Sequence, residues 1–179
     1  MKHKTLLTGM ILVLIGLTIT HFTIKPNNEL SSKNATKDTL AINAGKDKEM
    51  QKAFEQARKT LKNFLDIAET QPEDTQGYSL KIGIIEDEIT EFFWVYPFEK
   101  TEEGFSARIN NQPKMIDSVF KGEIVNFTRG QIVDWTYDNK ETETLHGNFT
   151  GCVEVKREAP DNAEQFMKLY GLNCDFLSE

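Results

Sequence analysis

The spacing of hydrophobic residues changes along the chain, and the first clear period is helical. From Asp47 onward, apolar side chains recur at the spacing of one helix face: Met50, Ala53, Phe54, Ala57, Leu61 and Phe64. Asp47 is a favourable N-cap residue, and Glu49 follows in the first turn. This pattern predicts an amphipathic helix that begins at Asp47 and ends before Pro72.

After Pro72 the period changes to two, which is typical of strands. Leu80, Ile82 and Ile84 alternate with polar or small residues, whereas residues 92–96 are apolar on both faces. The second pattern predicts a central strand that is covered by the helix on one side and by further structure on the other. Additional strands are predicted at residues 105–109, 123–127, 132–133 and 151–155.

A second helix is predicted near the C-terminus. Asp161 and Glu164 fit a capping box, and Phe166, Met167 and Tyr170 follow on one helix face. The order of elements predicts an α+β fold, with an N-terminal amphipathic helix packed on an antiparallel meander sheet of about five to six strands and a C-terminal helix.

The first 46 residues have a different pattern. Residues 5–23 carry no charge and follow Lys2 and Lys4, which is the layout of an export signal. Residues 5–24 number 20, close to the roughly 20 that span a bilayer core. We expect a signal or anchor segment over residues 1–24 and a flexible polar linker over residues 25–46.

The flanking charges predict the orientation of this segment. Lysines on its N-terminal side hold that end in the cytoplasm, which places the folded domain, residues 47–179, in the cell envelope, periplasmic or otherwise extracytoplasmic. No convincing small-x-small cleavage site follows the apolar run, so we favour an uncleaved membrane anchor over a cleaved signal. A buried helix of the domain itself is the remaining alternative.

The charge of residues 47–179 restricts the partners. This part has 15 Lys and Arg against 26 Asp and Glu, a net charge of −11. Binding to nucleic acid depends on cations that neutralise phosphates, so we expect no nucleic-acid partner. The expected partners are the membrane, through the N-terminal segment if it is uncleaved, and a protein or a small ligand.

Cysteine and histidine are scarce. Cys152 and Cys174 both follow the export segment, so a disulfide could persist, but the sequence leaves open whether they pair or remain as two buried thiols. Beyond residue 46 the chain has one histidine, His146, which we interpret as a surface-loop residue. Phosphate-binding glycine motifs and nucleophile elbows are absent from the sequence. We therefore expect no metal or cofactor and assign no catalytic residue.

Two acidic residues stand apart from the charged turns. Asp134 and Glu91 each neighbour apolar strand residues, and Trp135 and Tyr137 follow Asp134. Exposed aromatic rings beside a carboxylate can bind a sugar or a peptide. In the structural alternative, which we favour, Trp135 fills the core and Asp134 caps a turn. The aromatic stripe at residues 92–98 is likewise interpreted as core.

An ordered set of short motifs extends from about Asp47 to Val155. It comprises the helix pattern from Met50 to Phe64, Glu91-x-x-Trp94, Asn110-x-x-Pro113, Gly122-Glu123-x-Val125, Ile132-x-Asp134-Trp135-x-Tyr137 and Gly147-Asn148-Phe149-Thr150. In these motifs the chain resembles the YegJ-like family of bacterial proteins, a domain of unknown function. The resemblance implies a shared structural role for Asn110, Pro113, Asp134, Trp135, Gly147 and Asn148, and it implies no particular activity.

From these observations we expect a non-enzymatic envelope domain that binds a protein or a small ligand. The candidate ligand-binding residues are Glu91, Asn110, Pro113, Asp134, Trp135, Tyr137 and Asn148. One alternative is a carboxylate-based hydrolase that uses Asp134 as acid or base. Another is an inhibitor or immunity-type protein, because small acidic domains can neutralise basic partners.

Overall fold

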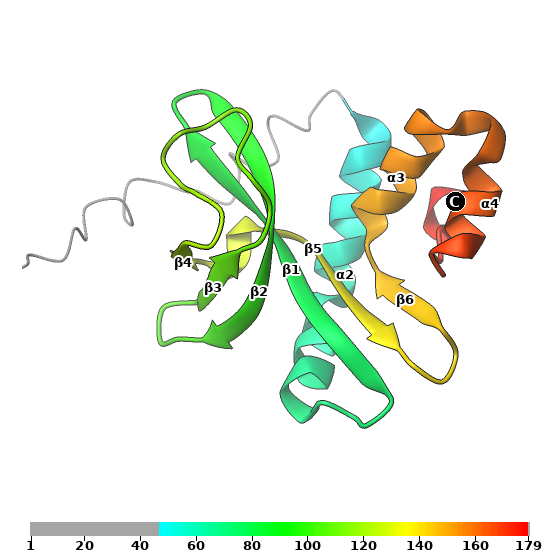
Figure 1. Cartoon of the computed structure of the whole chain (residues 1–179), viewed down its shortest axis with the longest axis horizontal. Coiled ribbons are helices and arrows are strands. Elements are labelled where there is room, and N and C mark those ends of the chain that lie inside the picture. The colour runs from blue at the N-terminus through cyan, green and yellow to red at the C-terminus, as the bar shows by residue number, and fades with distance from the viewer. Residues whose placement is uncertain (1–46, 179) are drawn as a thin grey trace, which may run out of the picture. The chain divides into compact units, whose positions relative to one another are not determined.

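A helix packed on a six-stranded antiparallel sheet forms the body of the molecule, which confirms the predicted α+β fold (Figure 1). The computed structural model describes residues 47–178. The helices are α2 (Lys48–Thr70), α3 (Phe149–Glu158) and α4 (Ala163–Leu169). The strands are β1 (Thr75–Glu86), β2 (Ile89–Lys100), β3 (Phe105–Ile109), β4 (Ile124–Phe127), β5 (Ile132–Asn139) and β6 (Thr144–Gly147).

The strand order in the sheet is β4-β3-β2-β1-β5-β6, and every neighbouring pair is antiparallel. Strands β1 to β4 follow one another as a meander. Strand β5 then returns to pair with β1, so the predicted simple meander is interrupted once. This return makes β1 the centre of the sheet and places β2 and β5 on its two sides.

Helix α2 forms where the helical period predicted it and extends to Thr70. The Asp47 side chain accepts a hydrogen bond from the Met50 N–H at 3.1 Å, which satisfies one free donor of the first turn. The buried face of the helix consists of Ala53, Phe54, Ala57, Leu61, Phe64 and Leu65. Burial of each large apolar side chain contributes about 1.5–3 kcal/mol, so this face fixes α2 to the sheet.

One face of the sheet carries the core that α2 covers. Leu80, Ile82, Phe93 and Val95 are fully buried there. Trp135 of β5 is 7 % exposed, and its ring stacks on Phe64 of α2 with 4.9 Å between centroids. Its indole N–H donates to the Ala57 carbonyl oxygen at 3.1 Å, so Trp135 joins the sheet to the helix.

Residues 151–155 are helical, so the strand predicted there is wrong. They belong to α3, whose buried residues include Cys152 and Val153. Val153 and Val155 are two residues apart, which is the strand period, but so short a segment does not distinguish a strand from a helix. The capping box predicted at residues 161–164 does not form either, because Asn162 is the N-cap of α4 and its side chain makes no capping bond.

The second face of β2 is only partly covered, contrary to the prediction of a strand covered on both sides. Trp94 is half-buried and Tyr96 is 45 % exposed. The predicted anchor at residues 1–24 and linker at residues 25–46 lie outside the described residues. Between residues 47 and 178, no helix combines the length and apolar character needed to cross a bilayer.

Candidate functional site

A hollow of about 460 Å³ lies between the second face of the sheet, α3 and the chain that follows α4. We call it the α3 hollow. Its polar and aromatic lining consists of Trp94, Asp138, Asn148, Glu154, Glu158 and Tyr170. Leu145 and Leu172 complete one wall, and an isolated parallel bridge joins these two residues. The hollow therefore collects side chains from β2, β5, β6, α3 and the segment after α4.

The register of the sheet places Trp94 in the α3 hollow. Lys81 of β1 lies opposite Trp94 of β2 and also opposite Asp134 of β5, so these three side chains form one row across the second face of the sheet. The Lys81 ammonium lies 5.5 Å from the centre of the Trp94 ring, within the range of a cation–π contact. Trp94 thus has one side against Lys81 and contributes to the hollow.

A hydrogen-bond network connects the buried carboxylate of Asp134 with the hollow. The Thr150 hydroxyl donates to Asp134 Oδ2 at 2.7 Å and accepts a bond from Lys81 Nζ at 3.0 Å. Lys81 Nζ also donates to Glu154 Oε1 at 3.0 Å. The Glu154 side chain is 50 % exposed, so this network runs from a fully buried group to a solvent-accessible one.

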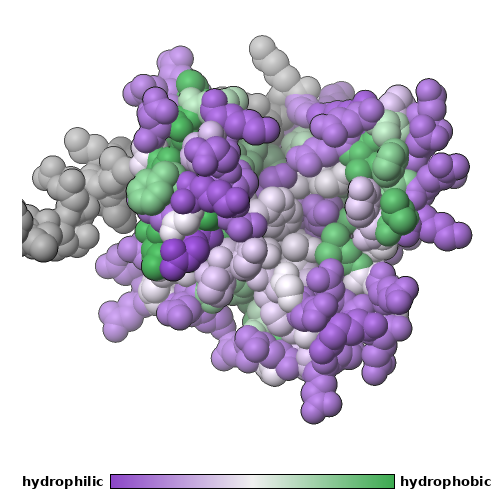
Figure 2. All heavy atoms as spheres, viewed as in Figure 1, coloured by the Kyte–Doolittle hydropathy of each residue, from purple (hydrophilic) through white to green (hydrophobic). Residues whose placement is uncertain are grey.

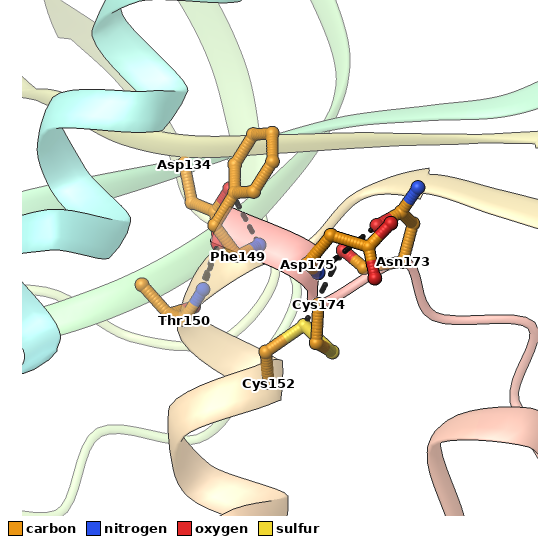
Figure 3. Close-up of a disulfide and its surroundings, with 7 residues drawn as sticks. All are labelled: Asp134, Phe149, Thr150, Cys152, Asn173, Cys174 and Asp175. Atoms are coloured by element: carbon orange, nitrogen blue, oxygen red, sulfur yellow. Dashed lines mark hydrogen bonds between the residues drawn. A yellow bond between two sulfur atoms is a disulfide. The ribbon is translucent and has the colours of Figure 1, made fainter. Parts of the chain in front are cut away.

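Asp134 caps the N-terminal end of α3 from the neighbouring strand (Figure 3). Its Oδ1 accepts bonds from the backbone N–H groups of Trp135 and Phe149, and its Oδ2 accepts the N–H of Thr150. Phe149 and Thr150 are the first residues of α3, whose N–H groups have no partner within the helix. Asp134 is fully buried, so in this structure its carboxylate serves the fold.

Burial raises the pKa of Asp134 from 3.8 to about 6, because the charged form loses hydration. The hydrogen bonds from Thr150 and Trp135 and the positive charge of Lys81 oppose this shift. The raised pKa follows from the fully buried position of the carboxylate and requires no ligand.

The position of Asp134 leaves the Asn148 amide available to the hollow. Asn148 is the N-cap residue of α3, with a left-handed φ of 52°, yet its side chain makes no capping bond. No other hydrogen bond of this side chain is found among residues 47–178. Gly151 provides the space for it, because a Cβ at residue 151 would lie 2.6 Å from Asn148 Oδ1. The amide is therefore a donor and acceptor that can serve a ligand.

A disulfide fixes the wall of the hollow that follows α4. Cys152 of α3 is bonded to Cys174, with 5.7 Å between the two Cα atoms (Figure 3). The ring of Phe176 packs edge-on against Phe149 at 5.3 Å, which adds an apolar contact beside the bond. Tyr170 and Leu172 precede this linkage by a few residues, so the disulfide limits how far they can move from α3.

The charge of the hollow is acidic. Asp138, Glu154 and Glu158 contribute three carboxylates to its lining, and no Lys or Arg is among the lining residues described. Lys81, which lies over the Trp94 ring, pairs with Glu154 and offsets the charge of that carboxylate, so Asp138 and Glu158 carry the remaining negative charge. The hollow therefore favours a cationic group over an anionic one.

Glu91 holds a loop on another part of the sheet. It is 6 % exposed and accepts N–H bonds from Lys114, Met115 and Ile116 at 2.8, 2.9 and 3.2 Å. The Asn110 N–H donates to the Trp94 carbonyl oxygen, while the Asn110 side chain is exposed. Pro113 is half-buried in the same loop. These three residues shape residues 110–116 rather than a cavity.

The seven predicted site residues therefore do not form one site. Asp134 lies beneath α3, and Trp135 and Tyr137 lie in the core. Asn148 is the member of the set that lines the α3 hollow. The interpretation of His146 as a loop residue is wrong: it lies in β6, half-buried, and stacks on Tyr137 with 4.6 Å between ring centres. In the part of the chain that the structure describes, no group of three or more His, Cys, Asp or Glu side chains could hold a metal ion.

Several lining residues had no usable signal in the sequence. Glu154 and Glu158 lie one helical turn apart on α3, but the predicted strand at residues 151–155 hid that relation. Trp94 belongs to the aromatic stripe at residues 92–98, whose strand spacing predicts a core position. The incomplete cover of its strand became evident only with the position of α3 in space.

Sequence comparison places the chain in a known family. It belongs to the family described as "Uncharacterized protein conserved in bacteria (DUF2314)", which matches residues 47–174. The chain is similar to "Uncharacterized protein YegJ" of Escherichia coli (strain K12), with 27% identity over 139 residues, 77% of this chain and 84% of that protein. No solved structure matches the chain. The predicted YegJ-like resemblance is thus confirmed.

Proposed function

We propose that this protein is an exported binding domain and that the α3 hollow is its binding site. The observation that carries the proposal is the hollow itself, which has a volume of about 460 Å³. Around it lie the Trp94 and Tyr170 rings, three carboxylates and the Asn148 amide, which makes no hydrogen bond among residues 47–178. Such a combination of apolar rings and a few polar groups is typical of ligand sites.

A rigid frame supports binding at this position. Asp134 fixes the start of α3, and the disulfide of Cys152 fixes its middle to the chain after α4. A site whose walls are held in place loses less conformational entropy when a ligand binds. The hydrolase alternative gains no support from the geometry, because Asp134 is fully buried and bonded to four donors.

Location in the cell envelope is the second part of the proposal. Two observations support it: the charge-free residues 5–23 that follow Lys2 and Lys4, and the disulfide between Cys152 and Cys174. Disulfides persist in extracytoplasmic compartments and are rare in the reducing cytosol. If residues 1–24 are not cleaved, they hold the protein at the membrane and leave the acidic domain to meet its partner outside.

Site-specific photo-crosslinking in the host bacterium tests the binding site. The full chain carries a benzoylphenylalanine in place of Tyr170, which is 57 % exposed and lines the hollow. A second strain carries it in place of Phe120, which is 63 % exposed and lies outside the hollow. We expect an adduct from position 170 that is absent from position 120. No adduct at position 170, or the same adducts at both positions, would overturn the proposal.

A further inference from the structure

We propose that the α3 hollow and the exposed face of α4 form one docking surface for a cationic amphipathic segment of a partner protein. This inference rests on the proposed binding function and specifies the partner. It follows from two neighbouring features of the surface, the acidic lining of the hollow and an uncovered apolar strip on α4.

The apolar strip consists of Phe166 and Leu169 of α4 and of Tyr170, which follows the helix; they are 36 %, 74 % and 57 % exposed. Phe166 and Leu169 also line a second depression of about 160 Å³ on α4. Figure 2 shows apolar residues among hydrophilic ones on the side of the molecule where Figure 1 places α4. A contiguous exposed patch of large apolar side chains is typical of an interaction surface.

The strip is continuous with the hollow. The rings of Phe166 and Tyr170 stack with 6.2 Å between centroids, and Tyr170 is also a wall of the hollow. A single ligand can therefore contact the apolar strip and the carboxylates of the hollow at the same time. A small amine would fill only the hollow and leave Leu169 uncovered. The surface therefore favours a longer ligand that carries both cationic and apolar groups.

Charge decides which kind of segment fits. Glu154 and Glu158 lie one turn apart on α3, are both exposed, and face the hollow together with Asp138. Lys or Arg side chains of a partner can pair with Asp138 and Glu158, which have no cationic partner among residues 47–178, while its apolar side chains cover Phe166, Leu169 and Tyr170. An anionic lipid surface is disfavoured, because residues 47–179 carry a net charge of −11. A cationic amphipathic protein segment satisfies both features.

A designed peptide pair provides the direct test. The full chain, in a neutral detergent, is titrated into a fluorescein-labelled amphipathic helix built from Leu and Lys, and into a counterpart built from Leu and Glu. Fluorescence anisotropy measures binding at low and at high salt. We expect the Lys peptide to bind and the Glu peptide to bind at least about tenfold more weakly. We also expect high salt to weaken the binding of the Lys peptide, because salt screens the charge interactions.

Matched variants locate the interaction on the molecule. The pair Glu154→Gln and Glu158→Gln is compared with Glu102→Gln and Glu103→Gln, which remove the same charge from an exposed turn. The pair Leu169→Ser and Tyr170→Ser is compared with Phe120→Ser and Ile124→Ser, two exposed apolar residues elsewhere. We expect a rise in Kd of about tenfold for each site pair and less than about twofold for each control pair. Circular dichroism checks that every variant is folded.

The outcomes separate this inference from the binding function on which it rests. Equal binding of the two peptides, or equal losses in site and control variants, overturns the inference. If neither peptide binds but position 170 still yields its own adduct in cells, the partner is not a cationic segment and the binding function stands. If neither peptide binds and no adduct forms, both proposals fail.

Discussion

The carboxylate of Asp134 closes the N-terminal end of α3 from the adjacent strand β5, 15 residues away in sequence from Phe149. A helix N-terminus presents free N–H groups and a partial positive charge, so an anionic acceptor stabilises it. The usual local cap is replaced here, and the Asn148 side chain is released toward the hollow. One buried residue thus determines both the position of α3 and the chemistry of the candidate site.

Replacement of Asp134 by Asn should lower the free energy of unfolding by about 2–3 kcal/mol at pH 7. The amide keeps one acceptor oxygen, but its NH₂ group faces the Thr150 N–H and hydroxyl and cannot accept from them. Urea unfolding of the two proteins measures the difference. The control variant Asp138→Asn, a charge-matched change on the same strand, should alter the free energy of unfolding by less than about 0.5 kcal/mol. A stability of the Asp134 variant equal to that of the control would contradict the capping role.

The difference in unfolding free energy between wild type and Asp134→Asn should change with pH in a definite direction. The pKa of Asp134 is raised from 3.8 to about 6, so between these values the folded protein holds a proton that the unfolded chain releases. The contribution of Asp134 to stability is therefore largest below pH 4 and is lost as pH rises through about 6. The difference between wild type and Asp134→Asn should be about 2 kcal/mol larger at pH 4 than at pH 7. Other groups titrate in both proteins and cancel, and a difference that shrinks at pH 4 would refute the raised pKa.

At the scale of elements, the sequence pattern predicts those helices and strands that are stabilised by residues close to them in sequence. Helix α2 has its own N-cap in Asp47 and a complete apolar face, and it forms as predicted. Strand β3 has its predicted bounds, because Phe105, Ala107 and Ile109 alternate inward. Helix α3 was missed because its cap, Asp134, and its disulfide partner, Cys174, lie far away in sequence. The α3 hollow depends on that helix, so it could not be predicted either.

The disulfide should matter most for the C-terminal elements. In the variant Cys152→Ala with Cys174→Ala, we expect hydrogen exchange to accelerate across residues 163–178 while α2 and the central strands stay protected. The loop that the bond closes spans 22 residues, so its loss should also lower the free energy of unfolding by about 2–4 kcal/mol. Hydrogen–deuterium exchange with mass spectrometry reports both regions in one experiment. Uniform acceleration over the whole domain would show that the bond does not act locally.

At the scale of the whole molecule, the chain combines an acidic domain with a basic, apolar N-terminal segment. Residues 1–46 have 6 Lys against 2 Asp and Glu, in contrast to the net charge of −11 that follows. This contrast in charge fits the proposed location, in which residues 1–24 lie at the membrane and the acidic domain lies outside the cytoplasm. The proposed envelope location is one in which the disulfide between Cys152 and Cys174 would persist, because disulfides are rare in the reducing cytosol.

Location and redox state should therefore change together. We expect the full chain to be recovered from the envelope fraction without free thiols, and a version that lacks residues 1–24 to remain in the cytosol with both Cys152 and Cys174 reduced. Alkylation with a mass-tagged maleimide in denaturant, before and after reduction, counts the thiols in each fraction. Reduction of the exported protein restores two reactive thiols and serves as the internal control. The reduced cytosolic version should also unfold at a lower temperature, because it lacks the cross-link. Full-length protein found in the soluble cytosol with two free thiols would remove the basis for placing the α3 hollow, and any partner that docks there, outside the cytoplasm.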